Sequence, residues 1–223
     1  MRNIDKTTIF STKYKHWEEN LGDIHESYES TKYHKLFYKD VIMNLYYCQK
    51  GVCAYTEILL CDDIFFDKKH WKDEKYIEPT PFKKSGQLDH FDPTLKKEKG
   101  WLWDNFFMVD NTINHDKGTK KVYSFLKPDV KDYSPNDYFE YDEEKNRFTP
   151  HSKYIKENEK YQQIYQMIDV LGLNHDTIVK HRKIFLKQAK KAIEFGIHSW
   201  ENYPIEQFFT AFEMIKPTNQ SNK

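Results

Sequence analysis

Aromatic residues constrain the fold of this 223-residue chain more than any other feature. It carries 16 Tyr, 16 Phe and 5 Trp, and each such ring buries roughly 150–250 Å² when it packs. A mean hydropathy of −0.91 and 31% charged residues would by themselves suggest disorder, but disordered chains are poor in aromatic residues. The composition therefore predicts a compact aromatic core, and the length favours one large domain or two small ones.

Charge and cysteine content narrow the class of protein further. Thirty-five basic and 35 acidic side chains give a formal net charge of zero, which removes the simplest argument for nucleic-acid binding, a globally basic chain. Three cysteines cannot build a disulfide framework and fit a reducing compartment. No apolar run approaches the ~18–20 residues of a membrane span, and the first residues lack the apolar stretch of a signal peptide. We expect a cytoplasmic protein with no membrane partner.

Hydrophobic periodicity and turn residues predict an α+β fold. Apolar residues recur at three- and four-residue steps in 27–48, 161–171 and 176–195, which predicts helices, the last capped by Asn174 or Asp176. Shorter helical elements are expected at 14–20, from about 111, and at 205–215. Residues 52–61 are typical of a short hairpin, whereas the proline-containing segment 127–153 is expected to wrap over the surface.

One group of polar residues in the middle of the chain has the composition of a phosphodiester-hydrolysing site. It reads D-H-x14-N-x8-N-x2-K-G and consists of Asp89-His90, Asn105, Asn114 and Lys117-Gly118. An imidazole of near-neutral pKa can take a proton from water. Carboxylate and amide oxygens are ligands that Mg²⁺ prefers, and a bound ion would polarise the phosphate and neutralise its developing charge.

This pattern resembles the HNH (ββα-metal) endonucleases and, among them, the small PtuB-like nucleases of the Septu anti-phage system. The matching pieces are C-A-Y-T-E at 53–57, D-H-F-D-P at 89–93, W-D-N-F-F-M at 103–108 and N-H-D-K-G at 114–118. The opening M-R-N-I and L-G-L-N at 171–174, with Arg182, are also similar. The resemblance therefore covers nearly the full length, and the order and spacing of the pieces carry its specificity.

The resemblance implies a fold, a function and partners. The fold would be a ββα-metal element embedded in a mostly helical shell. The corresponding regions would be an N-terminal helical region at 1–50, the nuclease core at 51–126, a C-terminal helical region at 127–216 and a disordered tail at 217–223. The activity would be hydrolysis of DNA in anti-phage defence, with Mg²⁺ or Mn²⁺ as cofactor. The implied partners are DNA, an ABC/SMC-like ATPase subunit and, in some relatives, a retron reverse transcriptase with its DNA.

Carried over by position, the resemblance also implies residue roles at the centre of the site. His90 would be the general base. Asn105 would orient the loop that bears this base, by hydrogen bonding rather than by ligation. Asp89 and Asn114 would hold the metal ion.

Five further residues belong to this expected site. Lys117 would contact phosphate by resemblance, and Lys120 and Lys121 follow it at positions where a phosphate would lie. His115 would replace its neighbour as a metal ligand if the register slipped by one residue. Glu57 matches a family position without an assigned role, and a structural role is the stronger alternative for it.

A structural zinc site of the family has no counterpart in this sequence. The family would need cysteines at four positions, which here are Cys53, Thr56, Asp110 and Ile113. A tetrahedral zinc site closes with four N or S ligands, so no structural zinc is expected. We expect apolar packing to stabilise this part of the fold in place of zinc, with Ile113 against Trp101, Trp103 and Phe107.

Several alternatives remain open from the sequence alone. The chain could be a catalytically degraded HNH-fold subunit that binds nucleic acid or a partner, a structural subunit of an ATPase complex, or a nuclease directed at RNA or tRNA. The last long helix has a basic side made of Lys180, Arg182, Lys183, Lys187, Lys190 and Lys191. That side is either a solvated face or a stripe that tracks phosphates.

Overall fold

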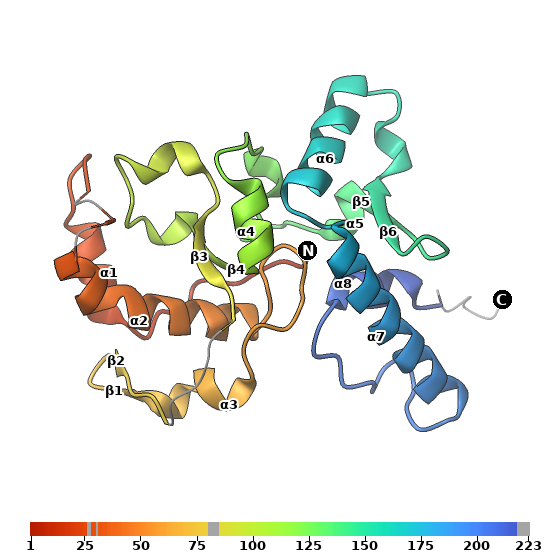
Figure 1. Cartoon of the computed structure of the whole chain (residues 1–223), viewed down its shortest axis with the longest axis horizontal. Helices are drawn as coiled ribbons and strands as arrows, with labels where there is room; N and C mark the ends of the chain where they lie inside the picture. The colour runs from red at the N-terminus through yellow and green to blue at the C-terminus, as the bar shows by residue number, and fades with distance from the viewer. Residues whose placement is uncertain (26–27, 30, 80–84, 218–223) are drawn as a thin grey trace.

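The structure is a computed structural model that describes residues 1–25, 28–29, 31–79 and 85–217. It is an α+β fold, as the sequence predicts, with helices and three two-stranded antiparallel sheets in the described residues (Figure 1). The predicted disordered tail lies outside the described residues, apart from position 217. In chain order the helices and strands are α1 (Thr12–Glu19), α2 (Thr31–Gln49), α3 (Asp63–Phe66), β1 (Trp71–Lys72), β2 (Lys75–Tyr76), β3 (Gln87–His90), β4 (Phe106–Val109), α4 (Asn111–Lys117), α5 (Pro135–Tyr138), β5 (Phe139–Asp142), β6 (Arg147–Pro150), α6 (Asn158–Val170), α7 (Asp176–Glu194) and α8 (Phe209–Ile215).

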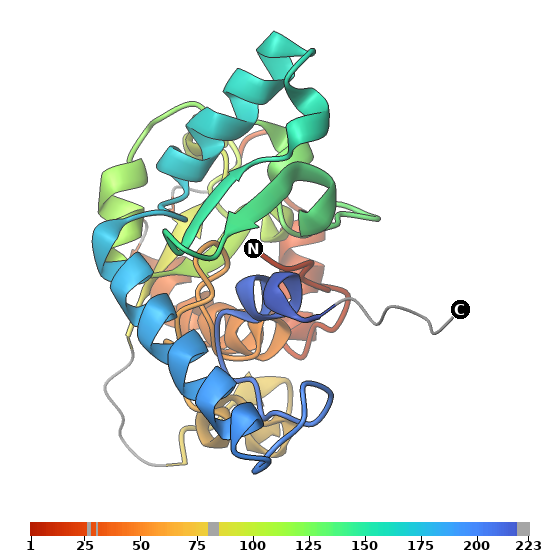
Figure 2. The same cartoon turned by 90° about the vertical axis from the view of Figure 1, so that its right-hand side faces the viewer.

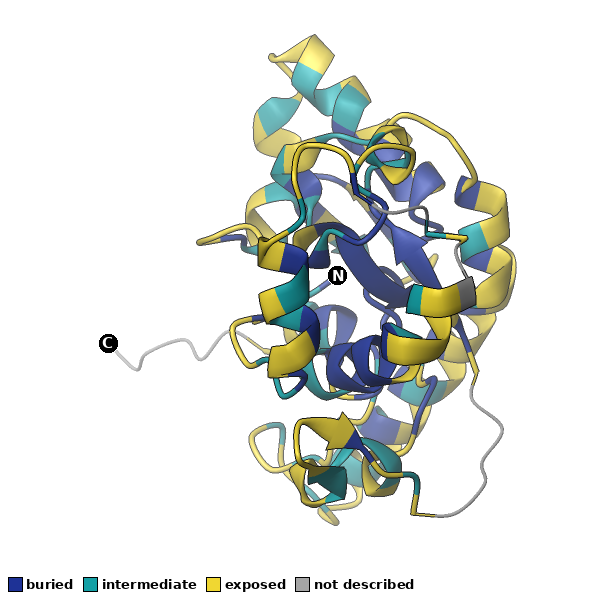
Figure 3. Ribbon diagram, turned by 90° about the vertical axis from the view of Figure 1, so that its left-hand side faces the viewer, coloured by how far each residue is buried: buried dark blue, intermediate teal, exposed yellow. Residues whose placement is uncertain are grey.

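The strand pair β3–β4 and the helix α2 form the centre of the hydrophobic core. All four residues of β4 are buried, and α2 packs along this strand. The aromatic residues concentrate here as expected, because Trp101, Phe106 and Phe107 are completely buried. Figure 3 shows the buried residues gathered at the centre of the molecule, with exposed residues at its rim. A rigid core therefore lies directly beneath the D-H-x14-N segment.

The helices predicted from periodicity are confirmed, and the hairpin predicted at 52–61 is present only as two short antiparallel arms joined by a tight turn. This segment contains one isolated antiparallel bridge, between Val52 and Leu59. The chain turns tightly between them: the Glu57 N–H donates to the Cys53 carbonyl, and Glu57 has a left-handed φ of 61°. A turn that uses five residues leaves too few for two paired strands, although the apolar composition is the same.

Within the segment 127–153, which the sequence predicts to wrap over the surface, β5 and β6 form a hairpin that the sequence reasoning missed. Phe139 and Phe148 are buried on one face of this hairpin, and polar side chains alternate with them. Pro150 stands at the end of its strand, where a missing N–H is tolerated. This proline thus lies at the end of the β5–β6 hairpin and does not prevent it from forming.

The C-terminal helices pack on this hairpin and on the beginning of the chain. Helix α6 contacts β6, and α8 contacts β5. Figure 2 shows α8 beside the N-terminus, and the Met1 ammonium donates to the Thr210 hydroxyl at 3.1 Å. No helix in the described ranges has the length and apolar composition needed to cross a membrane.

Two details of α7 differ from the sequence prediction. Asn174 does not cap the helix; its side-chain amide exchanges two 2.8 Å hydrogen bonds with the backbone of Phe148. Arg182 does not belong to the basic outer side, because it is 1% exposed and donates to the carbonyls of Leu173 and Asn146. Its guanidinium also lies over the Phe148 ring at 4.8 Å. The outward basic residues of α7 are therefore all lysines.

Candidate active site

The predicted site residues lie on one strand–strand–helix unit formed by β3, β4 and α4. The two strands are antiparallel, with Asp89 opposite Phe107 and His90 opposite Phe106. A single residue, Asp110, separates β4 from α4, and its carboxylate caps the helix by accepting the N–H of Thr112 at 2.9 Å. This short connection turns α4 back onto β3.

His90 is a buried imidazole whose proton can be located from its contacts. Its Nε2 lies 2.9 Å from the Gly100 carbonyl oxygen, and since a carbonyl only accepts, Nε2 carries the proton and Nδ1 keeps a lone pair. The rings of Tyr28 and Phe106 meet it edge-to-face, with centroids at 4.9 and 5.0 Å. Burial lowers the pKa of His90 to about 4. The imidazole is therefore neutral at pH 7, the form that accepts a proton, but it is a weaker base than the near-neutral imidazole that the sequence predicts.

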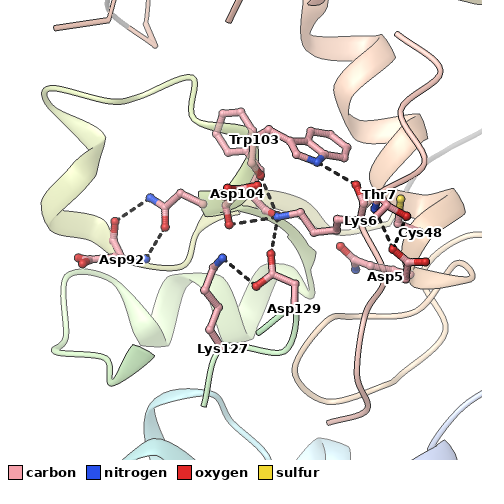
Figure 4. A network of polar contacts seen from close by, with 12 residues as sticks. Asp5, Lys6, Thr7, Cys48, Asp92, Trp103, Asp104, Lys127 and Asp129 are labelled. Atoms are coloured by element: carbon pink, nitrogen blue, oxygen red, sulfur yellow. Dashed lines mark hydrogen bonds and ion pairs between the residues drawn. The ribbon is translucent and has the colours of Figure 1, made fainter. Parts of the chain in front are cut away.

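Asn105 fastens the loop that follows His90. Its Oδ1 accepts the Asp92 N–H at 2.8 Å, and its Nδ2 donates to the Asp92 carbonyl at 2.9 Å (Figure 4, left). Its own carbonyl accepts the Phe91 N–H at 2.8 Å. These contacts are the ones that a loop-orienting role requires, and they leave neither end of the amide free for ligation.

Lys6 supports the same region from the N-terminal segment, a contact the sequence reasoning missed. Its buried ammonium donates to the carbonyls of Trp103, Asp104 and Phe106 at 2.8, 3.1 and 3.1 Å, and pairs with Asp129 at 3.0 Å (Figure 4). Burial lowers the pKa of Lys6 to about 8. A lone lysine near the start of a sequence carries no pattern that could have indicated this role.

Asp89 is held by a buried cation of the protein itself. Lys117 Nζ lies 3.1 Å from each carboxylate oxygen of Asp89 and donates to the His90 carbonyl at 2.8 Å. The hydroxyl of Tyr55 donates to Asp89 Oδ2 at 2.5 Å. Lys117 is 0% exposed and Asp89 6%. Burial raises the pKa of Asp89, although the ammonium and the hydroxyl act against this shift.

The structure does not bring His90, Asp89 and Asn114 to one point. Successive side chains of a strand point to opposite faces, so Asp89 faces α4 while His90 faces Gly100 and the aromatic rings. Asn114 contacts β3 two residues before Asp89, where its Nδ2 donates to Gln87 Oε1 at 3.1 Å.

These donors do not fit a shared divalent ion as they are arranged. Mg²⁺ needs several oxygen ligands at close range, and both oxygens of Asp89 are already bound by Lys117, whose positive charge would lie beside the ion. Among the described residues, no three His, Cys, Asp or Glu side chains form a group that could hold a metal. We therefore derive no chemical step through a metal ion.

The other predicted phosphate ligands lie outside the core, unlike Lys117. Lys120 and Lys121 are exposed in the segment after α4, and Lys121 Nζ lies 4.9 Å from the Tyr123 ring centroid. Lys120 lines a cavity of about 320 Å³ between α4 and α6. His115 is exposed on α4 and, with Asn114, borders a shallow surface depression.

Of the four positions of the family's zinc site, Thr56 and Asp110 contact the thiol of the first, Cys53. Its Sγ accepts the N–H of Thr56 at 3.5 Å and that of Asp110 at 3.4 Å. Ile113 packs on Gly172, where a Cβ would stand 2.4 Å from the isoleucine Cδ1 and where φ is +65°. Hydrogen bonds to sulfur and apolar packing thus connect this point to the turn after α6.

Glu57, for which the sequence left the role open, joins distant segments. It is 2% exposed, its Oε1 lies 3.1 Å from the Met1 ammonium, and its Oε2 accepts the Thr210 N–H at 2.8 Å. Burial alone would raise the pKa of Glu57, but the ammonium and the Thr210 hydrogen bonds lower it overall. The carboxylate is thus engaged in fastening α8 and the N-terminus.

No protein-family model and no curated protein sequence matches this chain.

Proposed function

We propose that this protein hydrolyses phosphodiester bonds of DNA, with His90 as the general base. The single observation that carries the proposal is the state of this imidazole. It is neutral, its Nε2 proton is fixed by the Gly100 carbonyl, and its loop is held by Asn105. It also lies at the end of the strand in the D-H-x14-N-x8-N-x2-K-G pattern, and β3, β4 and α4 would form the ββα element of an HNH nuclease.

The contacts define what each residue would do in the reaction. His90 Nδ1 takes a proton from the attacking water, whose oxygen bonds to phosphorus as the bond from phosphorus to the leaving oxygen breaks; solvent protonates that leaving oxygen. The Gly100 carbonyl stabilises the imidazolium that forms by accepting a hydrogen bond from its Nε2–H. Asn105 keeps the following loop in place during this transfer. Lys120 and Lys121 are exposed and can contact a phosphate, whereas Lys117 is buried.

The biological setting rests on the resemblance alone. By that resemblance the nuclease acts in anti-phage defence with an ABC/SMC-like ATPase, and in some relatives with a retron reverse transcriptase. Mg²⁺ or Mn²⁺ is the cofactor that the resemblance implies, and it enters the assay as a variable because the present donors do not fit it.

The test is a cleavage assay with several substrates and ions. The purified chain, alone and with an ATPase encoded beside it, is incubated with supercoiled plasmid and with RNA in Mg²⁺, in Mn²⁺ or in EDTA. We expect nicked and linear plasmid. Cleavage of RNA only would overturn DNA as the substrate. Cleavage that EDTA abolishes would show that Lys117 gives up Asp89 to a metal ion.

A non-cleaving binding subunit is the second candidate, and the Lys117–Asp89 pair favours it. This pair supplies a positive charge beside the carboxylate without any metal. Intact plasmid and intact RNA under every condition, with retained binding to DNA or to the ATPase, would establish this alternative.

A further inference from the structure

Helix α7 presents a stripe of lysines to solvent. Its inner face buries Ile178, Leu186 and Ala189 against the core. At 100° per residue, its five lysines fall within an arc of about 100° on the other side. We call this set the α7 lysine stripe: Lys180, Lys183, Lys187, Lys190 and Lys191.

No acidic residues stand among the lysines of the stripe, whereas an ordinary solvated helix face mixes acidic and basic residues. The sequence has no Asp or Glu between Asp176 and Glu194. Lysines three and four positions apart repel one another, as Lys183–Lys187 and Lys187–Lys191 do here. Of the five, Lys190 alone pairs with an acid, Glu143, within the described part of the chain. A chain with equal numbers of acids and bases thus concentrates unneutralised charge on one helix face.

The form of the stripe matches a nucleic-acid backbone better than a protein or a membrane. From Lys180 to Lys191 the helix rises about 16 Å, a length over which one DNA strand presents about five phosphates. Lysine is depleted in protein–protein interfaces. A membrane-surface helix needs its apolar face free, whereas α7 has buried that face in the core.

The start of α7 lies beside α4, which packs on the face of β3 opposite the His90 ring. His175, just before α7, lies 3.8 Å from Asp116 on α4. Lys120 and Arg147 line the cavity next to this contact. Figures 1 and 2 show α7 running from there toward the end of the molecule. A polymer bound at α4 can therefore continue along α7.

We propose that the α7 lysine stripe binds the phosphate backbone of duplex DNA and so holds the substrate outside the active site. This inference rests on the proposed function, since it assumes that DNA is the substrate. It names a binding surface of lysines that take no part in the chemistry.

Binding without cleavage tests the inference. The affinity of the full chain for a 24-base-pair duplex is measured by fluorescence anisotropy in EDTA at several salt concentrations. The stripe variant is Lys183→Gln/Lys187→Gln/Lys191→Gln. The matched control, Lys68→Gln/Lys72→Gln/Lys75→Gln, removes the same charge from exposed lysines before and within the β1–β2 hairpin.

We expect the stripe variant to bind roughly tenfold more weakly or worse, and its slope of log affinity against log salt to shrink by about 3. The control should bind as the unmodified chain does. Equal losses in both variants, no loss in either, or a loss confined to an RNA duplex measured in parallel would overturn the inference. If the chain never cleaves DNA but binds it through the stripe, the proposed nuclease function is refuted and the proposed binding surface stands. If the chain cleaves DNA and the stripe variant binds as the unmodified chain does, the nuclease function stands and the binding surface is refuted.

Discussion

Removing the ammonium of Lys117 should reveal how much the fold depends on its contact with Asp89. We consider Lys117→Met, which keeps the length of the side chain and deletes the charge. Lys117 is 0% exposed and Asp89 6%, so the carboxylate would remain buried with Tyr55 as its remaining side-chain donor. Breaking a buried ion pair by removing one partner costs about 3–5 kcal/mol of unfolding free energy.

The same reasoning predicts that replacing both partners restores the unfolding free energy. Lys117→Met/Asp89→Leu should lie within about 1 kcal/mol of the unmodified chain or be more stable, because no unpaired charge is left in the core. The coupling energy of the double-mutant cycle should therefore exceed about 3 kcal/mol. An exposed pair, Lys13–Glu74 at 4.0 Å, serves as control and should show a coupling below about 1 kcal/mol.

Urea unfolding followed by circular dichroism measures these free energies, provided that the slope with urea stays constant. The reasoning would be refuted if Lys117→Met unfolded within about 0.5 kcal/mol of the unmodified chain. It would equally be refuted if the double variant were as unstable as the sum of the two single variants.

Three further predictions concern other buried charges and their effect on stability. Because the pKa of His90 is about 4 when folded and near 6.5 when unfolded, stability should fall as pH drops from 6.5 to 4, by up to about 3 kcal/mol. Urea unfolding at pH 7, 5.5 and 4.5 should show a smaller loss in His90→Gln, and equal losses would contradict the assignment. Glu57→Gln leaves the Met1 ammonium buried without a carboxylate and should lower the unfolding free energy by about 3 kcal/mol. A typical substitution costs about 1 kcal/mol, so a loss below about 0.5 kcal/mol would contradict this prediction. Lys6→Met should speed amide hydrogen exchange around Asn105, and unchanged protection there would refute its supporting role.

Part of this fold could be predicted because a local pattern of apolar residues is enough to indicate a helix. Helices α2, α6 and α7 each bury an apolar stripe with a helical period, and that period is legible in one sequence. The contact of Asn105 with the loop after His90 was implied by the resemblance alone. The β5–β6 hairpin was missed because its prolines and acids outweighed the alternation of Phe139 and Phe148.

The surroundings of the charged residues could not be predicted in the same way. Lysine and arginine are almost always exposed, so nothing in the sequence indicates that Lys117 and Arg182 point inward. Asp89 and His90 are neighbours in sequence, yet strand alternation gives them opposite faces and different partners. Whether such groups meet depends on which element packs on each face, which is a property of the whole fold.

The rate of plasmid cleavage with and without the imidazole tests the central claim most directly. Single-turnover nicking of supercoiled plasmid is compared among the unmodified chain, His90→Ala and a control, His16→Ala, which removes an exposed histidine from α1. The account predicts that His90→Ala lowers the rate by at least about 10²-fold while remaining folded by circular dichroism, and that the control keeps its rate. Nicking by His90→Ala at the rate of the unmodified chain would contradict the claim that this imidazole activates water.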